Sequence, residues 1–283
     1  MRRRRHLAAV AVLLGVLAAA TTGVVTWLRA HDVAPEVQRC AAALDGTPWS
    51  LTPEQADSAA LLAGTALRRG LPARAVTIAI ATALQESGLR NLDHGDLDSL
   101  GLFQQRPSQG WGTPEQVLDP VHATNAFYDA LVRVPGYRDL PITQAAQAVQ
   151  RSAFPQAYAQ HEAGSRAWAS ALTGYTPGAV TCTLPSPAPA DPAAALARVN
   201  RDLGVPATAA DGLVALDASA LPDGTAHPAR LGWAVGQWAV AAAQALRVTE
   251  VRVGDRVWTR TAGSWSPAAH AVAAGRVELV LAG

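Results

Sequence analysis

Glu86 is the residue whose type and position best suit chemistry. Residues 75–84 before it are all apolar or small, which predicts a buried helix, and Gly88 suits the position just beyond the end of that helix. The negative end of the helix dipole and the loss of water both raise the pKa of an acid placed there. An acid that is still protonated near neutral pH can give its proton to a leaving oxygen. The alternative is an acid that caps a loop or pairs with Arg90.

The acids that follow could supply a second carboxylate. Asp93, Asp96 and Asp98 alternate with other residues around His94. The spacing lacks the closing Glu of a helix-loop-helix calcium site, so it favours a solvated turn. Inverting and retaining glycosidases need two carboxyl groups, whereas an enzyme in which a hydroxyl of the substrate attacks needs only one. The sequence does not give the distance of these acids from Glu86.

Short helices separated by Pro and Gly are predicted around this acid. Thr52–Gln55 has the pattern of a capped helix start, and this helix is expected to run to about Arg69. The chain between Asp45 and Leu51 is expected to be a loop. Further helices are predicted to start at Thr113, Asp119, Ile142 and Ala157, the last running to Leu172.

Two segments carry a family resemblance. Residues 81–91 read ATALQESGLRN and residues 98–112 read DSLGLFQQRPSQGWG. This pair, with its flanks over roughly 51–173, resembles the soluble lytic transglycosylase and lysozyme-like family, in its actinobacterial exported type. The resemblance implies a largely helical lysozyme-like fold with Glu86 as the catalytic acid. It places five residues on the floor of a sugar-binding cleft: Ser87, Gly101, Leu102, Phe103 and Gln104.

The resemblance does not identify every residue that would contact the acid or the sugar. The family's Ala-Tyr-Asn-Ala-Gly motif is missing, and residues 145–158 read AAQAVQRSAFPQAY instead. Tyr158 and Gln150 are therefore the candidates to touch the acid, and Tyr158 is included among the substrate-binding residues. Trp111 either stacks on a sugar ring or plugs the underside of its loop.

The amino terminus predicts export. Arg2–Arg5 precede the uncharged apolar run Leu7–Leu28, which is long enough to cross a bilayer. The positive charge predicts a cytoplasmic N-terminus and a single-pass cell-membrane protein whose remaining part lies outside. The alternative is a secreted protein, with the signal peptide cleaved after the small residues Ala18–Ala20. The net charge of +1 gives no reason to expect a nucleic-acid partner.

Two cysteines, Cys40 and Cys182, are predicted to form a disulfide, because an exported protein with one cysteine pair most simply oxidises it. The alternative is two buried free thiols. The sequence has no Cys-x-x-Cys motif and no paired histidines, so no metal site and no cofactor are predicted.

The overall fold class is predicted to be α+β. Expected divisions are an Arg cluster with a transmembrane or signal segment at 1–30, a mainly α-helical lysozyme-like domain at 40–183, a stiff Pro/Ala linker at 184–192, and a small α+β domain at 193–283. In the last of these we expect helices at 193–203 and 227–246, a strand at 214–217, a hairpin across Gly254-Asp255 and a closing strand at 276–281.

This C-terminal region faintly resembles degenerate domains related to cell-wall metallopeptidases. Those relatives carry paired histidines on the closing strand, whereas here His270 is the histidine near that strand. A zinc site needs three protein ligands, so the region is predicted not to be a peptidase. Its four tryptophans, namely Trp233, Trp238, Trp258 and Trp265, are predicted to be core residues rather than glycan platforms.

The sequence thus predicts an enzyme that cleaves the β-1,4 bond between N-acetylmuramic acid and N-acetylglucosamine in peptidoglycan glycan strands. The alternative is an envelope scaffold that keeps the cleft and binds peptidoglycan without cleaving it.

Overall fold

The computed structural model describes residues 21–23, 37–151 and 155–283. The predicted membrane or signal segment lies outside the described residues, apart from residues 21–23. None of the helices that are described has the length and apolar character needed to cross a bilayer. Residues 38–283 form one compact unit of helices and antiparallel strands, so the fold is α+β as predicted.

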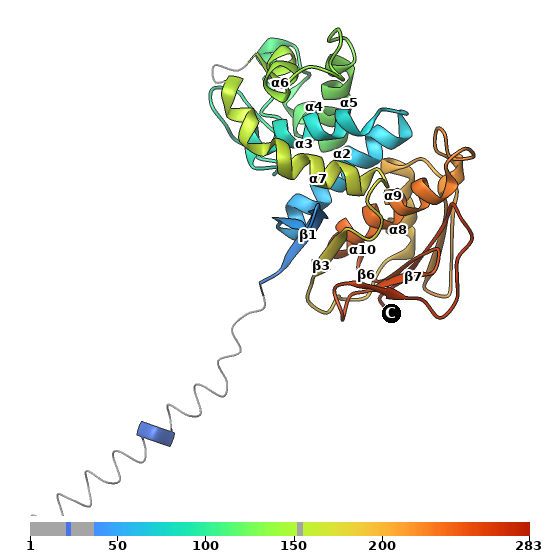
Figure 1. Cartoon of the computed structure of the whole chain (residues 1–283). Coiled ribbons are helices and arrows are strands. Elements are labelled where there is room, and N and C mark those ends of the chain that lie inside the picture. The colour runs from blue at the N-terminus through green and yellow to red at the C-terminus, as the bar shows by residue number, and fades with distance from the viewer. Residues whose placement is uncertain (1–20, 24–36, 152–154) are drawn as a thin grey trace, which may run out of the picture. The chain divides into compact units, whose positions relative to one another are not determined.

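Helix α3 (Ala73–Ser87) is at the centre of the helical part and packs against α2, α5, α6 and α7. Its residues from Ala75 to Ala83 are all buried, as their apolar character predicts. Helix α2 (Pro53–Arg68) starts with the predicted capping box, in which Thr52 and Gln55 satisfy each other's backbone N–H groups. Figure 1 shows these two helices among the others of the helical part.

Four further helices follow in the described residues of this part, and the first three match their predicted starts closely. They are α4 (Pro114–Leu118), α5 (Pro120–Leu131), α6 (Ile142–Gln150) and α7 (Glu162–Leu172). The prediction of one helix from Ala157 to Leu172 is wrong in its first turn and a half, because Pro155–His161 forms the 3-10 helix η2 before α7 begins. A second 3-10 helix, η1, spans Pro107–Gln109.

A three-stranded sheet is formed by the chain segments that precede and follow the helices of the helical part. Its order is β2-β1-β3, with β1 (Arg39–Leu44), β2 (Thr47–Leu51) and β3 (Val180–Thr183) all antiparallel. The predicted loop at 45–51 is therefore wrong over most of its length, because pairing with β1 makes it a strand. Cys40 and Cys182 lie directly opposite each other on β1 and β3 and form the predicted disulfide.

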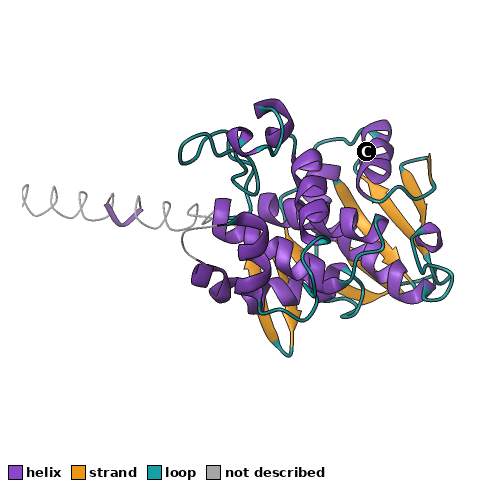
Figure 2. Cartoon of the chain, turned by 90° about the horizontal axis from the view of Figure 1, so that it is seen from above, coloured by secondary structure: helices purple, strands orange, loops and turns teal. Residues whose placement is uncertain are grey.

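The C-terminal part is a six-stranded antiparallel sheet with helices against it (Figure 2). The strand order is β4-β5-β9-β6-β7-β8. The strands are β4 (Ala207–Ala210), β5 (Leu213–Asp217), β6 (Val248–Val253), β7 (Arg256–Thr259), β8 (Trp265–Pro267) and β9 (Arg276–Leu281). The predicted hairpin is β6–β7. Helix α8 (Pro192–Asp202) precedes the sheet, and the predicted helix at 227–246 is divided at Ala242 into α9 (Pro228–Ala241) and α10 (Ala243–Leu246).

Helix α9 lies between the sheet and the helical part, because it packs on β6 and β9 and also on α2 and α7. Its Gln237 is fully buried, donates to the Ala171 carbonyl (2.6 Å) and accepts from the Val180 N–H (2.9 Å). The two regions expected as separate domains, 40–183 and 193–283, therefore share one core.

Residues 184–192 follow the surface of this unit instead of holding two bodies apart. The Pro185 carbonyl accepts a hydrogen bond from Arg260 (2.6 Å), and the Ala190 N–H donates to the Ala282 carbonyl (2.9 Å). The expected stiff linker is thus a packed connection, because its backbone has partners in the folded unit.

The core prediction for the tryptophans is confirmed for Trp238 and Trp258, which are fully buried. Trp233 and Trp265 are partly buried, pack against the same core and meet edge to face with ring centroids 5.0 Å apart.

Candidate active site

The end of α3 is shaped by two successive left-handed residues, Gly88 and Leu89, with φ values of 63° and 59°. Leucine seldom adopts this conformation, which costs about 1–2 kcal/mol. It is held here because its side chain is fully buried and its N–H donates to the Ala83 carbonyl at 2.8 Å. The Gln55 amide braces the turn from α2 by donating to the Gly88 carbonyl (2.8 Å). This turn ends the helix one residue after Glu86.

Glu86 is half-buried, and Tyr158 from η2 donates a hydrogen bond of 2.6 Å to its Oε1. Burial raises the pKa of Glu86 above its usual value, while the hydrogen bond from Tyr158 and a weaker one from Gln150 lower it in part. Desolvation prevails, so the pKa remains raised. Among the described residues Glu86 forms no ion pair, so the alternative contact with Arg90 is absent.

The loop after α3 is tied to the helix by its backbone. Ser87 Oγ lies 2.7 Å from the Leu102 carbonyl, to which it donates, and 3.1 Å from the Ala83 carbonyl. Gly101 has a φ of 76°, and a Cβ at this position would lie 2.5 Å from the Val117 carbonyl oxygen, so the loop requires glycine here. These contacts fix the position of the loop relative to Glu86.

Most of the five residues predicted for the cleft floor face the core. Leu102 and Phe103 are buried, and the Phe103 ring stacks on Phe127 with centroids 4.3 Å apart. Any contact of these two residues with a sugar is therefore through the backbone. Gln104 is partly exposed, has a left-handed φ of 48° and uses its amide to bind the carbonyls of His94 and Gly101, both at 3.3 Å. The side chains thus support the loop from below.

Two of the nearby aspartates, Asp93 and Asp98, are engaged with other partners. Asp98 forms an ion pair with Arg106 (2.6 Å) and accepts hydrogen bonds from Ser108, and these contacts hold the pKa of the Asp98 carboxyl well below its usual value. Asp93 is exposed and pairs with His94 at 2.7 Å. The side chains that shift the pKa of Glu86 are Tyr158 and Gln150. No described carboxylate is therefore among the groups that shift the pKa of Glu86.

A cavity of about 690 Å³ adjoins this region. It is lined by Gln109, Gly110, Trp111, Ala130, Arg133, Val134, Ala148, Val149, Gln150 and Arg151. Gln150 connects the cavity to the acid, since its Nε2 donates to the Phe103 carbonyl (2.7 Å) and its amide also stabilises the ionised Glu86. Both roles predicted for Trp111 are compatible with its position, because it lines the cavity and packs on the core.

Tyr158, predicted to bind substrate, is fully buried, donates to Glu86 and is not among the described residues that line the cavity. Three residues near the site were not among the candidates predicted from the sequence. The sequence pattern around Gln55 indicates a helix cap but not its contact with Gly88, and Arg133 and Arg151 belong to no motif. Arg133 and Arg151 come together because the ends of α5 and α6 pack side by side.

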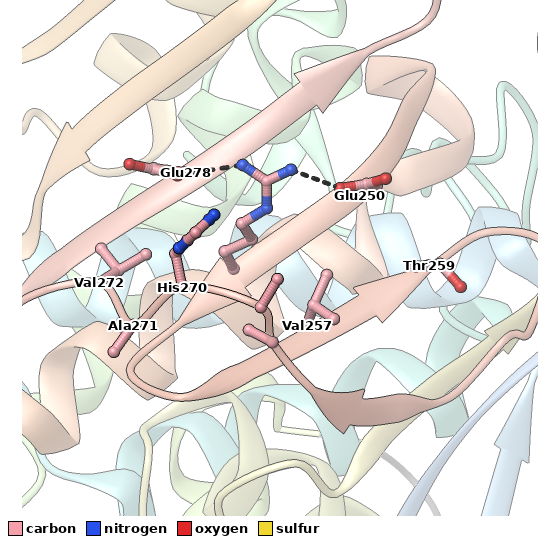
Figure 3. Close-up of a pocket in the computed structure, with 10 residues that line it drawn as sticks. Glu250, Val257, Thr259, His270, Ala271, Val272 and Glu278 are labelled. Carbon is pink, nitrogen blue, oxygen red and sulfur yellow. Dashed lines mark hydrogen bonds and ion pairs between the residues drawn. The ribbon is translucent and has the colours of Figure 1, made fainter.

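A second cavity, of about 340 Å³, lies on the sheet of the C-terminal part. Glu250 and Glu278 lie on either side of the Arg252 guanidinium at 2.8 and 3.4 Å, with His270 near them (Figure 3). Within the described residues no group of three or more His, Cys, Asp or Glu side chains is placed to hold a metal. The two carboxylates are engaged by arginine, and His270 is the histidine that lines this cavity.

No protein-family model matches the chain, and no curated protein matches it.

Proposed function

We propose that this protein is an exported, membrane-anchored enzyme that cleaves the β-1,4 bond between N-acetylmuramic acid and N-acetylglucosamine as a lytic transglycosylase. The observation that carries the proposal is the environment of Glu86, a half-buried acid with a raised pKa, without a cationic partner in the described residues. A group of this kind is suited to general acid catalysis. The proposal includes a membrane anchor formed by the apolar run Leu7–Leu28.

In the proposed reaction Glu86 gives its proton to the glycosidic oxygen as the bond to C1 of the muramyl sugar breaks. The resulting carboxylate then takes the proton of the muramyl 6-hydroxyl as that oxygen attacks C1, which yields a 1,6-anhydro end and restores the acid. The Tyr158 hydroxyl, 2.6 Å from Oε1, stabilises the carboxylate between the two steps. One carboxyl group therefore serves both steps, in agreement with the absence of a coupled acid among the described residues.

The second candidate is a peptidoglycan-binding scaffold. It is favoured by one observation, that Glu86 is not among the residues lining the 690 Å³ cavity. A scaffold needs the cavity but no access of substrate to the acid.

The test is to digest purified peptidoglycan with the full-length protein and to analyse the products by mass spectrometry. Anhydro ends support the proposal, whereas reducing ends indicate a hydrolase. The Glu86→Gln variant should lose activity by at least about 100-fold, the contribution typical of a general acid. If the wild type binds insoluble peptidoglycan without releasing products, and the variant binds equally well, the scaffold is the correct function.

A further inference from the structure

The 690 Å³ cavity is formed by three segments that are distant in the sequence. The end of α5 and its following turn supply Ala130, Arg133 and Val134, the end of α6 supplies residues 148–151, and residues 109–111 complete the wall. A volume of this size is typical of cavities that hold small ligands.

The charge of this cavity is positive and uncompensated. Arg133 and Arg151 line it, both side chains are exposed, and no acidic residue is among the lining residues. Neither arginine forms an ion pair with any residue that the structure describes. Other arginines of the helical part are paired, as Arg69 is with Asp129 and Arg74 with Glu162. Two free guanidinium groups are suited to carboxylates, which they can bind with two parallel hydrogen bonds.

The rest of the lining suits a peptide with small side chains. Ala130, Val134, Ala148 and Val149 give an apolar wall. Gln150 also lines the cavity, and its Oε1 is buried without a hydrogen-bond partner among the described residues. Trp111 offers an aromatic surface beside the arginines.

We propose that this cavity binds the carboxylates of the short peptides that branch from peptidoglycan strands, so that the protein selects peptide-bearing strands over bare glycan. The inference rests on the proposed function and names the form of its substrate. Gln150 is the physical link, because its side chain lines the cavity, donates to the Phe103 carbonyl and lowers the pKa of Glu86. Occupation of the cavity is thereby connected to the position of the acid.

The experiment compares two forms of one polymer. Cell-wall sacculi freed of phosphate polymers carry the peptides, and glycan strands prepared from them with an amidase do not. Binding and cleavage of each are measured for the full-length wild type, the single variants Arg133→Gln and Arg151→Gln, and the double variant. Arg166→Gln, which removes an exposed charge on α7 outside the cavity, is the matched control.

We expect the wild type to prefer peptide-bearing strands, and each single substitution to reduce that preference by about tenfold, the effect of losing one charged hydrogen-bonded contact. The Arg166→Gln control should bind and cleave both polymers as the wild type does. The preference should also weaken as salt is raised. Equal treatment of both polymers by the wild type, or an equal loss on both in the double variant, overturns the inference.

Failure of the inference can be distinguished from failure of the proposed function. Binding is measured separately with the Glu86→Gln variant and a soluble peptide-bearing disaccharide. If the wild type cleaves nothing but this variant binds the peptide-bearing form more tightly than the bare disaccharide, the enzyme proposal fails and the cavity assignment stands. If the wild type cleaves peptidoglycan but the variant binds both disaccharides equally, the cavity assignment fails and the enzyme proposal stands.

Discussion

The hydroxyl of Tyr158 lies 2.6 Å from Oε1 of Glu86, although the two residues are 72 positions apart in the sequence. Burial of the carboxyl favours its protonated form, and the tyrosine hydrogen bond favours its ionised form. The balance of these two effects determines the pH at which a general acid at this position keeps its proton.

Replacing Tyr158 with Phe should raise the pKa of Glu86 further, because the substitution removes a hydrogen bond that stabilises the carboxylate while leaving the site buried. If Glu86 is the acid, the high-pH limb of the cleavage profile should move to higher pH and the maximal rate should fall. A pH series with peptidoglycan measures both, and an NMR titration of carbon-13-labelled glutamate measures the pKa directly. A limb that moves to lower pH would show that the Tyr158 hydroxyl does not stabilise the Glu86 carboxylate.

The same raised pKa predicts how stability depends on pH. A carboxyl whose folded pKa exceeds its unfolded pKa contributes stability that is complete below the unfolded pKa and is lost as pH rises through the folded pKa. Glu86→Gln removes this loss, so its melting temperature should exceed that of the wild type at pH 7, and the difference should shrink towards pH 4. Differential scanning calorimetry at several pH values tests this. A difference that grows towards acid pH contradicts a raised pKa.

Arg198 compensates a fully buried carboxylate, that of Asp202, at 2.7 Å, and also pairs with Asp57 at 2.9 Å. Trp238 donates to the same carboxylate at 3.1 Å. Arg198→Met should lower the free energy of unfolding by about 3–5 kcal/mol, because it leaves a buried charge without its main partner. The remaining ion pair between Arg201 and Asp202 places the expected value near the lower end of this range.

Arg252→Met is the matched control for that substitution. Arg252 also pairs with two carboxylates, but its side chain and theirs are about one third exposed, so the expected loss is below about 1 kcal/mol. Urea denaturation of both variants provides the comparison. Equal effects would show that burial of the Arg198 network does not determine its contribution.

The disulfide between Cys40 and Cys182 closes a segment with a sequence separation of 142. In the chain-entropy model a bridge over a loop this long stabilises by about 5 kcal/mol. The Cys40→Ser/Cys182→Ser variant should therefore unfold at a clearly lower urea concentration than the wild type, and its stability should not respond to reductant. Mass spectrometry of the unreduced wild type should find no free thiol, and two alkylated cysteines would show that the bridge does not form.

The local sequence was sufficient to predict the helix that carries Glu86. Its apolar residues, the glycine that follows and the capping box of the preceding helix act over a few neighbouring residues, and the structure agrees at each. The same is true of the hairpin across Gly254-Asp255. The cysteine pair was predictable because an exported chain with two cysteines has one simple pairing.

Only the tertiary structure decided the rest, because the contacts concerned join residues distant in sequence. Residues 47–51 became a strand through pairing with β1, and the two expected domains merged because α9 has partners on both sides. Asp98 forms an ion pair with Arg106 and accepts a hydrogen bond from Ser108, so its carboxylate is engaged away from Glu86. The sequence by itself identified Glu86 as the candidate acid, and packing determined its surroundings, since desolvation and long-range hydrogen bonds depend on the assembled core.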